Sequence, residues 1–502
     1  MLVAGGGPVG LTLGVLLGHL GIGCVVAERR SGTSVLPRAT GLNVRSMEIF
    51  RGLGLEDSIR AVSLAGDGIP FLLVGETLTS PPRATVESEQ YLSVMPTGWP
   101  SPTQALWCAQ DQLEPLLLAA AASQESTTVV FDTELVSFTA GDRVRADLRD
   151  VRTGEIRTVE ADYLVGADGP RSTVRRLAGI GTSGHPAFAD ELSILFRADL
   201  EPALRGRRFF LYRVENAEVS GIMRPAGASG RWLFGTPGTA DTTPERCVAL
   251  VRAAVGDPGL DVEIIATGAW EAAALVADDF VWGRVVLAGD AAHQHTPGGG
   301  FGLTSGIQDA HNLAWKLAAI VDRWASPGLL SSYQAERRPL AQLTTELSVA
   351  RLQGGVAKSA RTLGVVLGAR YDTGAFVADG SSPPPVADPV TDYQPCARPG
   401  HRAPHIWLDT SHTTSMLDLF TGGFVLLTSA PVAWQAAVTA AARSGVPVRL
   451  EDPRVPGWTG AYGVGSGGAV LVRPDGYVAA RWPLPPEQPT LAHALSVILR
   501  PR

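Results

Sequence analysis

Residues 1–28 read MLVAGGGPVGLTLGVLLGHLGIGCVVAE, and this stretch decides the fold. A short apolar strand precedes Gly5-x-Gly7-x-x-Gly10, the glycines open a helix, and a second strand ends at Glu28. Glycines at these positions allow a tight turn, close approach of a pyrophosphate to the backbone, and close packing of the helix on the strand. The helix N-terminus attracts phosphate, and the carboxylate accepts ribose hydroxyls. The stretch predicts a dinucleotide-binding βαβ unit.

Two later motifs indicate which dinucleotide is bound. One is Gly166-Ala-Asp168-Gly169, and the other is Gly289-Asp290-Ala-Ala-His293, which leads through Pro297–Gly302 into a long helix expected from about Ser305 to Asp322. A nicotinamide site needs neither, whereas a flavin needs a second strand-end carboxylate for its ribityl chain and a second helix N-terminus. Two simpler interpretations remain open, namely that Asp168 is a turn residue and that Asp290 caps the helix that follows.

Composition excludes several classes of function. The chain has 502 residues and a net charge of −7, which gives no electrostatic footprint for nucleic acid or anionic membranes. Residues 10–27 have the length of a membrane span, but His19, further glycines and the following Glu28 argue against one. The four cysteines form no CxxC, so we expect reduced thiols in a cytoplasmic protein.

No metal site is predicted. His293 and His295 stand two residues apart in a Gly/Pro-rich loop, without a third ligand nearby in the sequence. A second match to the glycine pattern, Gly463-x-Gly465-x-x-Gly468, precedes an expected hairpin rather than a helix, so it predicts no dinucleotide site.

The predicted fold class is α/β, with a Rossmann-like FAD-binding domain, an antiparallel β-sheet substrate domain and a C-terminal thioredoxin-like domain. Runs of strands without helix-length spacers predict the second domain, and a β-α-β-β-β order predicts the third. The predicted boundaries are 1–177 for the first part of the FAD-binding domain (with substrate-domain segments near 60–105), 178–275 for the β-rich domain, 276–378 for the second part with long helices, 379–400 for a linker, and 401–502 for the tail, which lacks CxxC.

The three motifs together resemble the FAD-dependent aromatic hydroxylases of the p-hydroxybenzoate hydroxylase type, and especially the bacterial branch acting on polyketides such as anthracyclines and angucyclines. The resemblance covers almost the whole chain, including the tail. Relatives often carry Gln, Met and Asn where this chain has Phe301, Leu303 and Thr304. Backbone contacts to the flavin would survive these changes, but a side-chain amide contact to the flavin at Thr304 would not. The resemblance implies a set of cofactor-binding residues: Gly5, Gly7, Gly10, Glu28, Arg29, Arg38, Gln110, Asp168, Asp290, Pro297, Gly302 and Leu303. Without the resemblance, Arg38 could be a surface arginine and Gln110 a helix-start residue.

The resemblance also implies the reaction. NAD(P)H would reduce non-covalently bound FAD, and O2 would then yield a C4a-hydroperoxyflavin that hydroxylates a polycyclic phenol. The protein is expected to be a monomer or homodimer, without nucleic-acid or membrane partners. A polar residue that deprotonates or hydrogen-bonds a phenol makes its ring more nucleophilic, so one is expected beside the substrate. Tyr212 and Arg351 are the candidates for this catalytic role, and a structural role remains open for both. Baeyer–Villiger oxygenation of a polyketide ketone and a non-catalytic FAD- or ligand-binding protein remain alternatives, and a halogenase is disfavoured because its Trp-x-Trp-x-Ile-Pro segment is absent.

Substrate size follows from the β-rich segment. Six large apolar residues lie on or near its strands: Phe209, Phe210, Tyr212, Met223, Trp232 and Phe234. They could form ordinary sheet core or a wide apolar wall for a flat multi-ring ligand. No carboxylate-binding arginine for a single-ring acid can be located in the sequence, so a polycyclic ligand is favoured.

Overall fold

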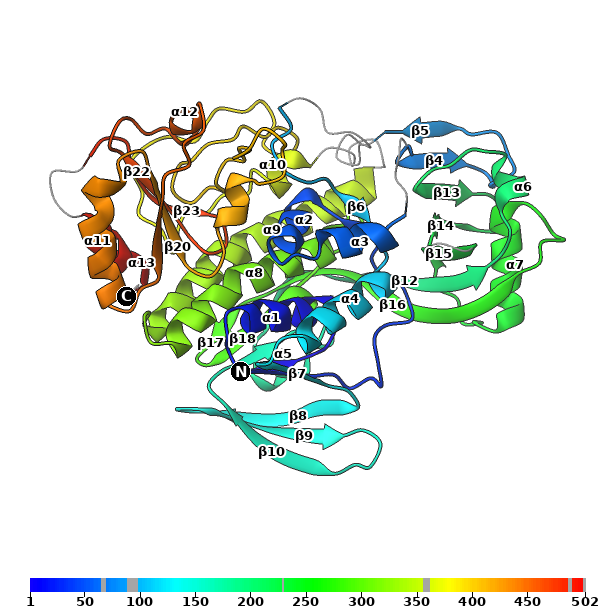
Figure 1. Ribbon diagram of the computed structural model, residues 1–502. Helices are drawn as coiled ribbons and strands as arrows, with labels where there is room; N and C mark the ends of the chain where they lie inside the picture. The colour runs from blue at the N-terminus through cyan, green and yellow to red at the C-terminus, as the bar shows by residue number, and fades with distance from the viewer. Residues whose placement is uncertain (65–68, 88–97, 228–229, 355–361, 486–489, 500–502) are drawn as a thin grey trace.

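The computed structural model describes residues 1–502 except 65–68, 88–97, 228–229, 355–361, 486–489 and 500–502 (Figure 1). Three units are defined by their sheets: a first unit around a mostly parallel sheet, a β-rich unit at the right of Figure 1, and a C-terminal unit at the left. The long helices of the first unit run between the other two.

The first unit has a six-stranded sheet in the order β17-β18-β11-β1-β2-β7. The strands are β1 (Leu2–Ala4), β2 (Cys24–Ala27), β7 (Thr127–Val130), β11 (Leu164–Gly166), β17 (Val281–Trp282) and β18 (Val285–Leu287). Only β17 is antiparallel to its neighbour. Segments from three distant parts of the chain therefore end at one edge, and ligands of open α/β sheets bind beyond that carboxyl edge.

Helices cover this sheet. They are α1 (Pro8–His19), α4 (Gln110–Ala122), α5 (Thr173–Leu177), α8 (Phe301–Val321) and α9 (Leu330–Gly354), with α2 (Val44–Gly52), α3 (Glu56–Val62) and α10 (Leu363–Val366) nearby. Among the described residues, 3₁₀ turns are found at Gly289–Ala291, Pro327–Leu329 and Met416–Leu419. Helix α1 is buried from Gly10 to Gly18, which explains its uncharged sequence. In the part of the chain that the structure describes, no helix is long and apolar enough to cross a membrane.

Helix α8 begins one turn earlier than the sequence predicted. Its N-cap is Gly300, whose φ of 66° suits glycine, so Phe301 and Gly302 belong to the first turn instead of the preceding loop. The helix ends at Val321, close to the predicted end.

The β-rich unit has an eight-stranded sheet in the order β19-β16-β12-β15-β14-β13-β4-β5. The strands are β4 (Leu72–Gly75), β5 (Ala84–Val86), β12 (Thr182–Arg197), β13 (Leu211–Glu215), β14 (Ser220–Pro225), β15 (Arg231–Pro237), β16 (Glu263–Ala277) and β19 (His293–Gln294). One face packs under α7 (Pro244–Val255), and α6 (Glu201–Leu204) lies beside it. Strands β4 and β5 join from the early part of the chain; residues 65–68 and 88–97 of that segment lie outside the described residues.

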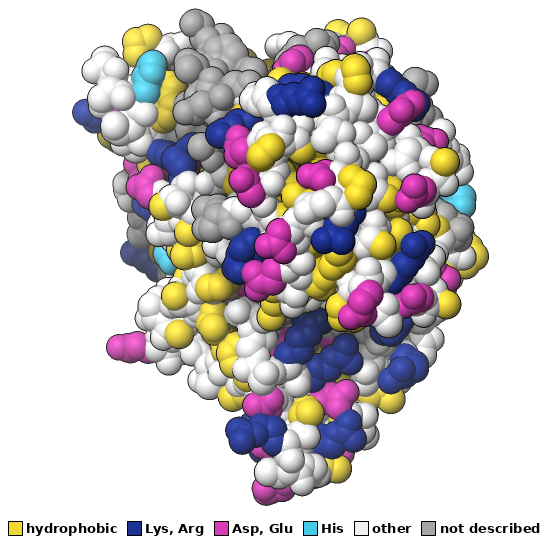
Figure 2. All heavy atoms as spheres, turned by 90° about the vertical axis from the view of Figure 1, so that its right-hand side faces the viewer, with side chains coloured by type: hydrophobic (Ala, Val, Ile, Leu, Met, Phe, Trp, Pro, Cys, Tyr) yellow, Lys and Arg dark blue, Asp and Glu magenta, His cyan; other side chains and the backbone are white. Residues whose placement is uncertain are grey.

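Two small sheets complete the first unit. Strands β3 (Gly41–Leu42) and β6 (Leu106–Trp107) pair, and β8 (Thr133–Ala140), β9 (Val144–Asp150) and β10 (Ile156–Ala161) form a projecting three-stranded sheet. Figure 2 shows basic and acidic side chains intermixed at the bottom, where this sheet projects in Figure 1. Exposed ion pairs such as Arg149–Glu134 account for the mixture, so it forms a solvated surface.

The C-terminal unit has a four-stranded sheet in the order β21-β20-β22-β23. Its elements are β20 (Phe424–Thr428), α11 (Pro431–Arg443), β21 (Val448–Glu451), α12 (Trp458–Tyr462), β22 (Ala469–Val472), β23 (Val478–Trp482) and α13 (Thr490–Leu499). Strand β20 is parallel to β21 and antiparallel to β22. The second glycine pattern lies between α12 and β22, and a strand follows it as predicted.

A buried ion network joins the C-terminal unit to the first unit. The Arg473 guanidinium, after β22, donates to the Glu336 carboxylate on α9 at 2.6 and 2.9 Å and also pairs with Asp475. Lys316 Nζ on α8 donates to Glu336 at 2.7 Å. Burial acts to raise the pKa of Glu336, but Arg473 and Lys316 outweigh it and lower that pKa to about 2. The network is therefore ionised at neutral pH.

The apolar core also runs through this junction. Phe424 of β20 meets Trp315 of α8 and Trp324 edge-on, with ring centroids 5.7 and 6.2 Å apart. From its Pro-rich linker and its hairpin ending, the sequence predicts a tail that folds separately, and this stays a prediction. The shared core and shared charges mean that removing the tail would expose Trp315 and deprive Glu336 of its main partner.

Candidate cofactor and substrate site

The turn between β1 and α1 has the geometry of a phosphate cradle. Gly5 has a φ of +105°, and a Cβ placed there would lie 2.3 Å from the Ala167 carbonyl oxygen. A Cβ on Gly10 would lie 1.9 Å from the Gly5 carbonyl oxygen, so helix and strand touch through glycine. A Cβ on Gly7 would meet nothing within 4 Å. The turn therefore packs tightly against neighbouring backbone at Gly5 and Gly10 and leaves open space beside Gly7, where a pyrophosphate can approach.

Glu28 stands at the end of β2, as predicted. Its Oε2 accepts from the Gly6 N–H at 2.7 Å and its Oε1 accepts from the Arg30 N–H at 2.9 Å. Those bonds fix the buried carboxylate beside the glycine turn and leave it lone pairs for two hydroxyl donors. Arg29, the next residue, is exposed.

Asp168 lies beside Gly5 but already has donors for both oxygens. It accepts from the Ser172 hydroxyl at 2.5 Å and from the backbone N–H groups of Thr173 and Val174 at 2.7 and 3.1 Å. Asp168 therefore holds the first turn of α5, and a direct contact with a ligand stays a prediction.

Asp290 lies in a 3₁₀ turn after β18, close to the start of α8. A Cβ placed on Gly302 would lie 3.8 Å from Asp290 Oδ1. Asp290 is exposed at the surface, but the protein around its carboxylate removes much of the hydration and so raises its pKa. His293 and Arg38 act in the opposite direction. An acceptor with these properties suits hydroxyl donors from a bound ligand.

The N-terminus of α8 has no side-chain cap and no acidic residue in its first turn. Its free N–H groups therefore carry the positive end of the helix dipole. Pro297 is exposed and Leu303 is half-buried at this end. The Thr304 hydroxyl donates back to the Phe301 carbonyl at 3.1 Å, so it is used within the helix.

Arg38 and Gln110 meet around Glu114. The Gln110 amide donates to Glu114 Oε1 at 2.7 Å, and the Gln110 N–H donates to the Ala39 carbonyl. The Arg38 side chain is exposed at the surface. The protein around it still removes part of its hydration, and this effect lowers the pKa of Arg38, whereas the carboxylates of Asp290 and Glu114 act to raise it. Arg38 is therefore close enough to interact electrostatically with both Glu114 of α4 and Asp290.

Asp309 and Arg337, two buried residues that the sequence analysis missed, support the Asp290 turn together with His293. His293 Nε2 lies 2.5 Å from Asp309 Oδ2, which also accepts from the Gly289 N–H, and Arg337 Nε donates to Asp309 Oδ1 at 2.8 Å. Burial acts to raise the pKa of Asp309, but His293 and Arg337 outweigh it and lower it to about 2. Asp309 lies among apolar residues of a long helix, and a buried acid needs a charged or hydrogen-bonding partner. This pattern could have revealed Asp309 from the sequence.

Helix α9 holds the loop that leads into α8. His295 Nε2 lies 2.9 Å from the Thr344 hydroxyl, and the Thr296 hydroxyl donates to the Ser348 carbonyl at 2.8 Å. Arg351 lies 5.2 Å above the Phe301 ring, and a Cβ on Gly299 would lie 2.7 Å from its Nη1. The structure thus brings Arg351 to the predicted Pro297–Gly302 loop. Its catalytic role stays a prediction.

Tyr212 lies elsewhere, in surroundings that favour the structural role left open for it, and its role in activating a substrate stays a prediction. Its hydroxyl donates to the Arg207 carbonyl at 3.0 Å and accepts from the Phe209 N–H at 2.8 Å, and burial raises its pKa to about 12. Tyr212, Met223 and Phe234 stand opposite one another on β13, β14 and β15, so all three share the face under α7.

Of the two alternatives for the large apolar residues of this sheet, the structure favours ordinary sheet core over an apolar wall. Trp232 joins the core under α7, and Phe210 instead stacks on Trp107 with ring centroids 3.2 Å apart. Alternation along a strand puts every second residue on one face, but the sequence does not say which face the helix covers. Most of the large apolar residues lie on the sheet face that packs against α7.

The opposite face of the sheet looks toward the 33–38 loop of the first unit. Leu195, Leu233 and Ala226 cluster there with Leu36. Arg224 also lies on this face and donates to the Pro37 carbonyl at 2.7 Å. Burial lowers the pKa of Arg224 to about 10, and no carboxylate of the described residues lies within ion-pairing distance.

No group of three or more His, Cys, Asp or Glu side chains within the described ranges could hold a metal ion. His293 faces Asp309 and His295 faces Thr344, so these histidines serve the loop described above.

Comparison with known proteins matches the chain to two families. The FAD binding domain family covers residues 1–348, and the aromatic-ring hydroxylase C-terminal family covers residues 396–501. A Streptomyces halstedii protein named for polyketide hydroxylation is 41% identical over 99% of this chain and 97% of its own length. Tetracenomycin A2 monooxygenase-dioxygenase of Streptomyces glaucescens is 37% identical over 97% of this chain and 94% of its own length.

A solved structure is similar over the same extent. Aklavinone-11 hydroxylase in a ternary complex with FAD and aklavinone superposes with a TM-score of 0.89 at 33% identity, covering 99% of this chain and 98% of that chain.

Proposed function

Because the chain belongs to the FAD-dependent aromatic-ring hydroxylases, which are flavoprotein monooxygenases, we propose that it hydroxylates a polycyclic phenol of polyketide origin. NAD(P)H is the proposed electron donor and O2 the oxygen source. The observation that carries the proposal is the arrangement at one sheet edge: the open glycine turn, Glu28, Asp290 and the uncapped start of α8. Together these groups fit a ligand with a pyrophosphate, a ribose, a second polyol chain and a ring that becomes anionic.

FAD has these parts, and each has a proposed partner. The pyrophosphate would lie against Gly7, the adenosine ribose would donate to Glu28, and the ribityl hydroxyls would donate to Asp290. When bound, FAD accepts a hydride from NAD(P)H and activates O2. The positive end of α8, at Gly302 and Leu303, would stabilise negative charge on the flavin ring.

The remaining predicted residues have supporting roles in this proposal. Arg38 would add positive charge near Asp290, and Gln110 would position Glu114 beside it. Asp168 would shape the loop against Gly5 through its cap of α5. Arg29, which is exposed, has no proposed partner in the protein.

Replacing Asp290 by alanine should weaken FAD binding roughly tenfold to 150-fold, since a hydrogen bond to a charged acceptor contributes about 1.5–3 kcal/mol. Equilibrium titration of the apoprotein with FAD measures the change. Asp241→Ala is a suitable control, because this exposed carboxylate accepts from the Thr243 hydroxyl in the loop before α7 of the β-rich unit. Equal FAD affinity in the wild type and the Asp290 variant would remove Asp290 from the site.

The substrate would lie between the sheet of the β-rich unit and the flavin. The sheet face that looks toward the first unit carries Leu195 and Leu233, and its buried cation, Arg224, already binds the Pro37 carbonyl. The apolar residues of this face favour a flat, multi-ring ligand.

Substrate class tests the proposed function directly. Naphthacene- or angucycline-like phenols should stimulate NAD(P)H oxidation with tight coupling to product, and p-hydroxybenzoate should not. Stopped-flow reduction of the flavin together with product mass measures both. Efficient coupled turnover of the small acid, with no response to polycyclic phenols, would overturn the substrate class and leave the flavin assignment. Product NMR separates hydroxylation from Baeyer–Villiger insertion, and absence of any stimulated oxidation would indicate a non-catalytic binding protein.

Tyr212→Phe should leave substrate-stimulated NAD(P)H oxidation unchanged but lower the free energy of unfolding by about 1–3 kcal/mol, because the Phe209 N–H loses its acceptor. Chemical denaturation and steady-state kinetics measure the two effects. Arg351→Met provides the contrast, since Arg351 lies beside the Pro297–Gly302 loop and should affect turnover. Lost turnover in Tyr212→Phe at full FAD loading would instead support a catalytic role for Tyr212.

We also propose a thioredoxin-like class for the C-terminal unit. The strand order β21-β20-β22-β23, with α11 connecting the parallel pair and an antiparallel hairpin following, supports this class. The unit has no CxxC, so no redox role is proposed for it.

A further inference from the structure

Two small pockets follow one another along α8. The first, here the flavin-side pocket, is lined by Phe301 and Thr304 at the start of α8, together with residues of α9 and α10. The second, the inner pocket, is lined by His311 and Asn312 further along the same helix. Gln308 lines both pockets.

Helix geometry explains this order. Residues three or four positions apart lie on the same face of a helix, and positions 301, 304, 308, 311 and 312 follow that spacing. Gln308 therefore lies on α8 between the lining residues of the flavin-side pocket and those of the inner pocket, and it lines both.

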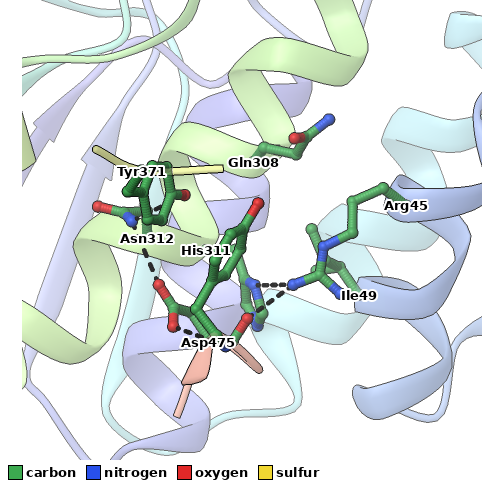
Figure 3. Close-up of a pocket in the computed structure, with 8 residues that line it drawn as sticks. Arg45, Ile49, Gln308, His311, Asn312, Tyr371 and Asp475 are labelled. Atoms are coloured by element: carbon green, nitrogen blue, oxygen red, sulfur yellow. Dashed lines mark hydrogen bonds between the residues drawn. The ribbon is translucent and has the colours of Figure 1, made fainter. Parts of the chain in front are cut away.

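The inner pocket is polar and is completed by the C-terminal unit (Figure 3). Arg45 on α2 donates to the Asp475 carbonyl at 2.7 Å, and Asn312 Nδ2 lies 3.2 Å from Asp475 Oδ2. Burial lowers the pKa of His311 to about 3, so this ring is neutral. A polar pocket with these donors and acceptors, and space for about one water, suits an ordered water.

Gln308 itself is half-buried, and none of the hydrogen bonds found among the described residues involves its amide. The amide can therefore bond to water, and the side chain contributes to the walls of both pockets. Water that reaches an oxygen-activating flavin promotes side reactions, and active sites of this kind exclude it.

We propose that Gln308 is a plug that keeps water of the inner pocket away from the flavin end of α8, and so determines how tightly NAD(P)H oxidation is coupled to hydroxylation. The inference rests on the proposed function. An opened passage would divert the reaction to NAD(P)H + H⁺ + O2 → NAD(P)⁺ + H2O2, in which O2 takes both electrons from NAD(P)H and the substrate gains no oxygen. Gln308 acts here through the space that it fills, as a positioning residue.

The test compares two variants of the FAD-loaded enzyme. Gln308→Ala removes the plug, and Gln308→Leu keeps its bulk without the amide. We expect a roughly threefold or larger rise in H2O2 formed per NAD(P)H for Gln308→Ala, and a ratio near wild type for Gln308→Leu. An equal rise in both variants, or no rise in either, would overturn the proposal.

Crystal structures of the same variants provide a second measurement that needs no turnover. Gln308→Ala should show continuous ordered water from the inner pocket to the flavin-side pocket, and Gln308→Leu should show none between them. Two separate pockets in Gln308→Ala would also overturn the proposal. If the wild type fails to oxidise NAD(P)H with polycyclic phenols, the proposed function fails, while this structural comparison still decides on the plug.

Discussion

Gly7→Ala should weaken FAD binding roughly 100-fold or more without changing the stability of the apoprotein. The added Cβ meets no protein atom within 4 Å, so folding is unaffected, but it occupies the space in which the pyrophosphate approaches the backbone. Loss of hydrogen bonds to a charged group costs about 1.5–3 kcal/mol each, which gives the size of the effect. FAD titration and thermal unfolding of the apoprotein measure the two quantities.

Two further variants make this result specific. Gly10→Ala places a Cβ 1.9 Å from the Gly5 carbonyl oxygen, so it should lose FAD and also lower apoprotein stability by more than about 3 kcal/mol. Gly23→Ala, in the same βαβ unit and without neighbours within 4 Å, should change neither quantity. Tight FAD binding in Gly7→Ala would show that the cofactor lies elsewhere.

Arg473→Met should lower the free energy of unfolding by about 3–5 kcal/mol, the cost of leaving buried charges without their partner. Arg473 is fully buried between Glu336 of α9 and Asp475 of its own turn, and both carboxylates would remain. Chemical denaturation of the full chain measures the change.

Matched variants separate the network from a general effect of removing arginine. Arg454→Met, in the same unit, removes an exposed ion pair with Asp452 and should cost less than about 1 kcal/mol. Arg473→Met with Asp475→Asn removes one charge of each sign and keeps the Lys316–Glu336 pair, so it should be more stable than Arg473→Met alone. Arg473→Met at wild-type stability would mean that the network does not hold the C-terminal unit in place.

The sequence was sufficient for the part of the site made by local structure. Gly5, Gly7 and Gly10 act through backbone conformation within six residues, and Glu28 and Asp290 each follow a recognisable strand. Parallel strands carry their ends to a common edge, so residues far apart in the chain could be expected together. A resemblance to a hydroxylase family followed from these motifs, and the matched families confirm it.

Only the tertiary structure decided which surfaces meet. The spacing of Tyr212, Met223 and Phe234 is the same whether their face packs under α7 or faces the first unit, because alternation fixes relative sides and not the partner. The pairing of Glu336 with Arg473, and the position of Gln308 in the walls of two pockets, depend on how separate units dock. Short-range patterns encode backbone form, whereas burial and charge pairing between distant segments exist only once the chain has packed.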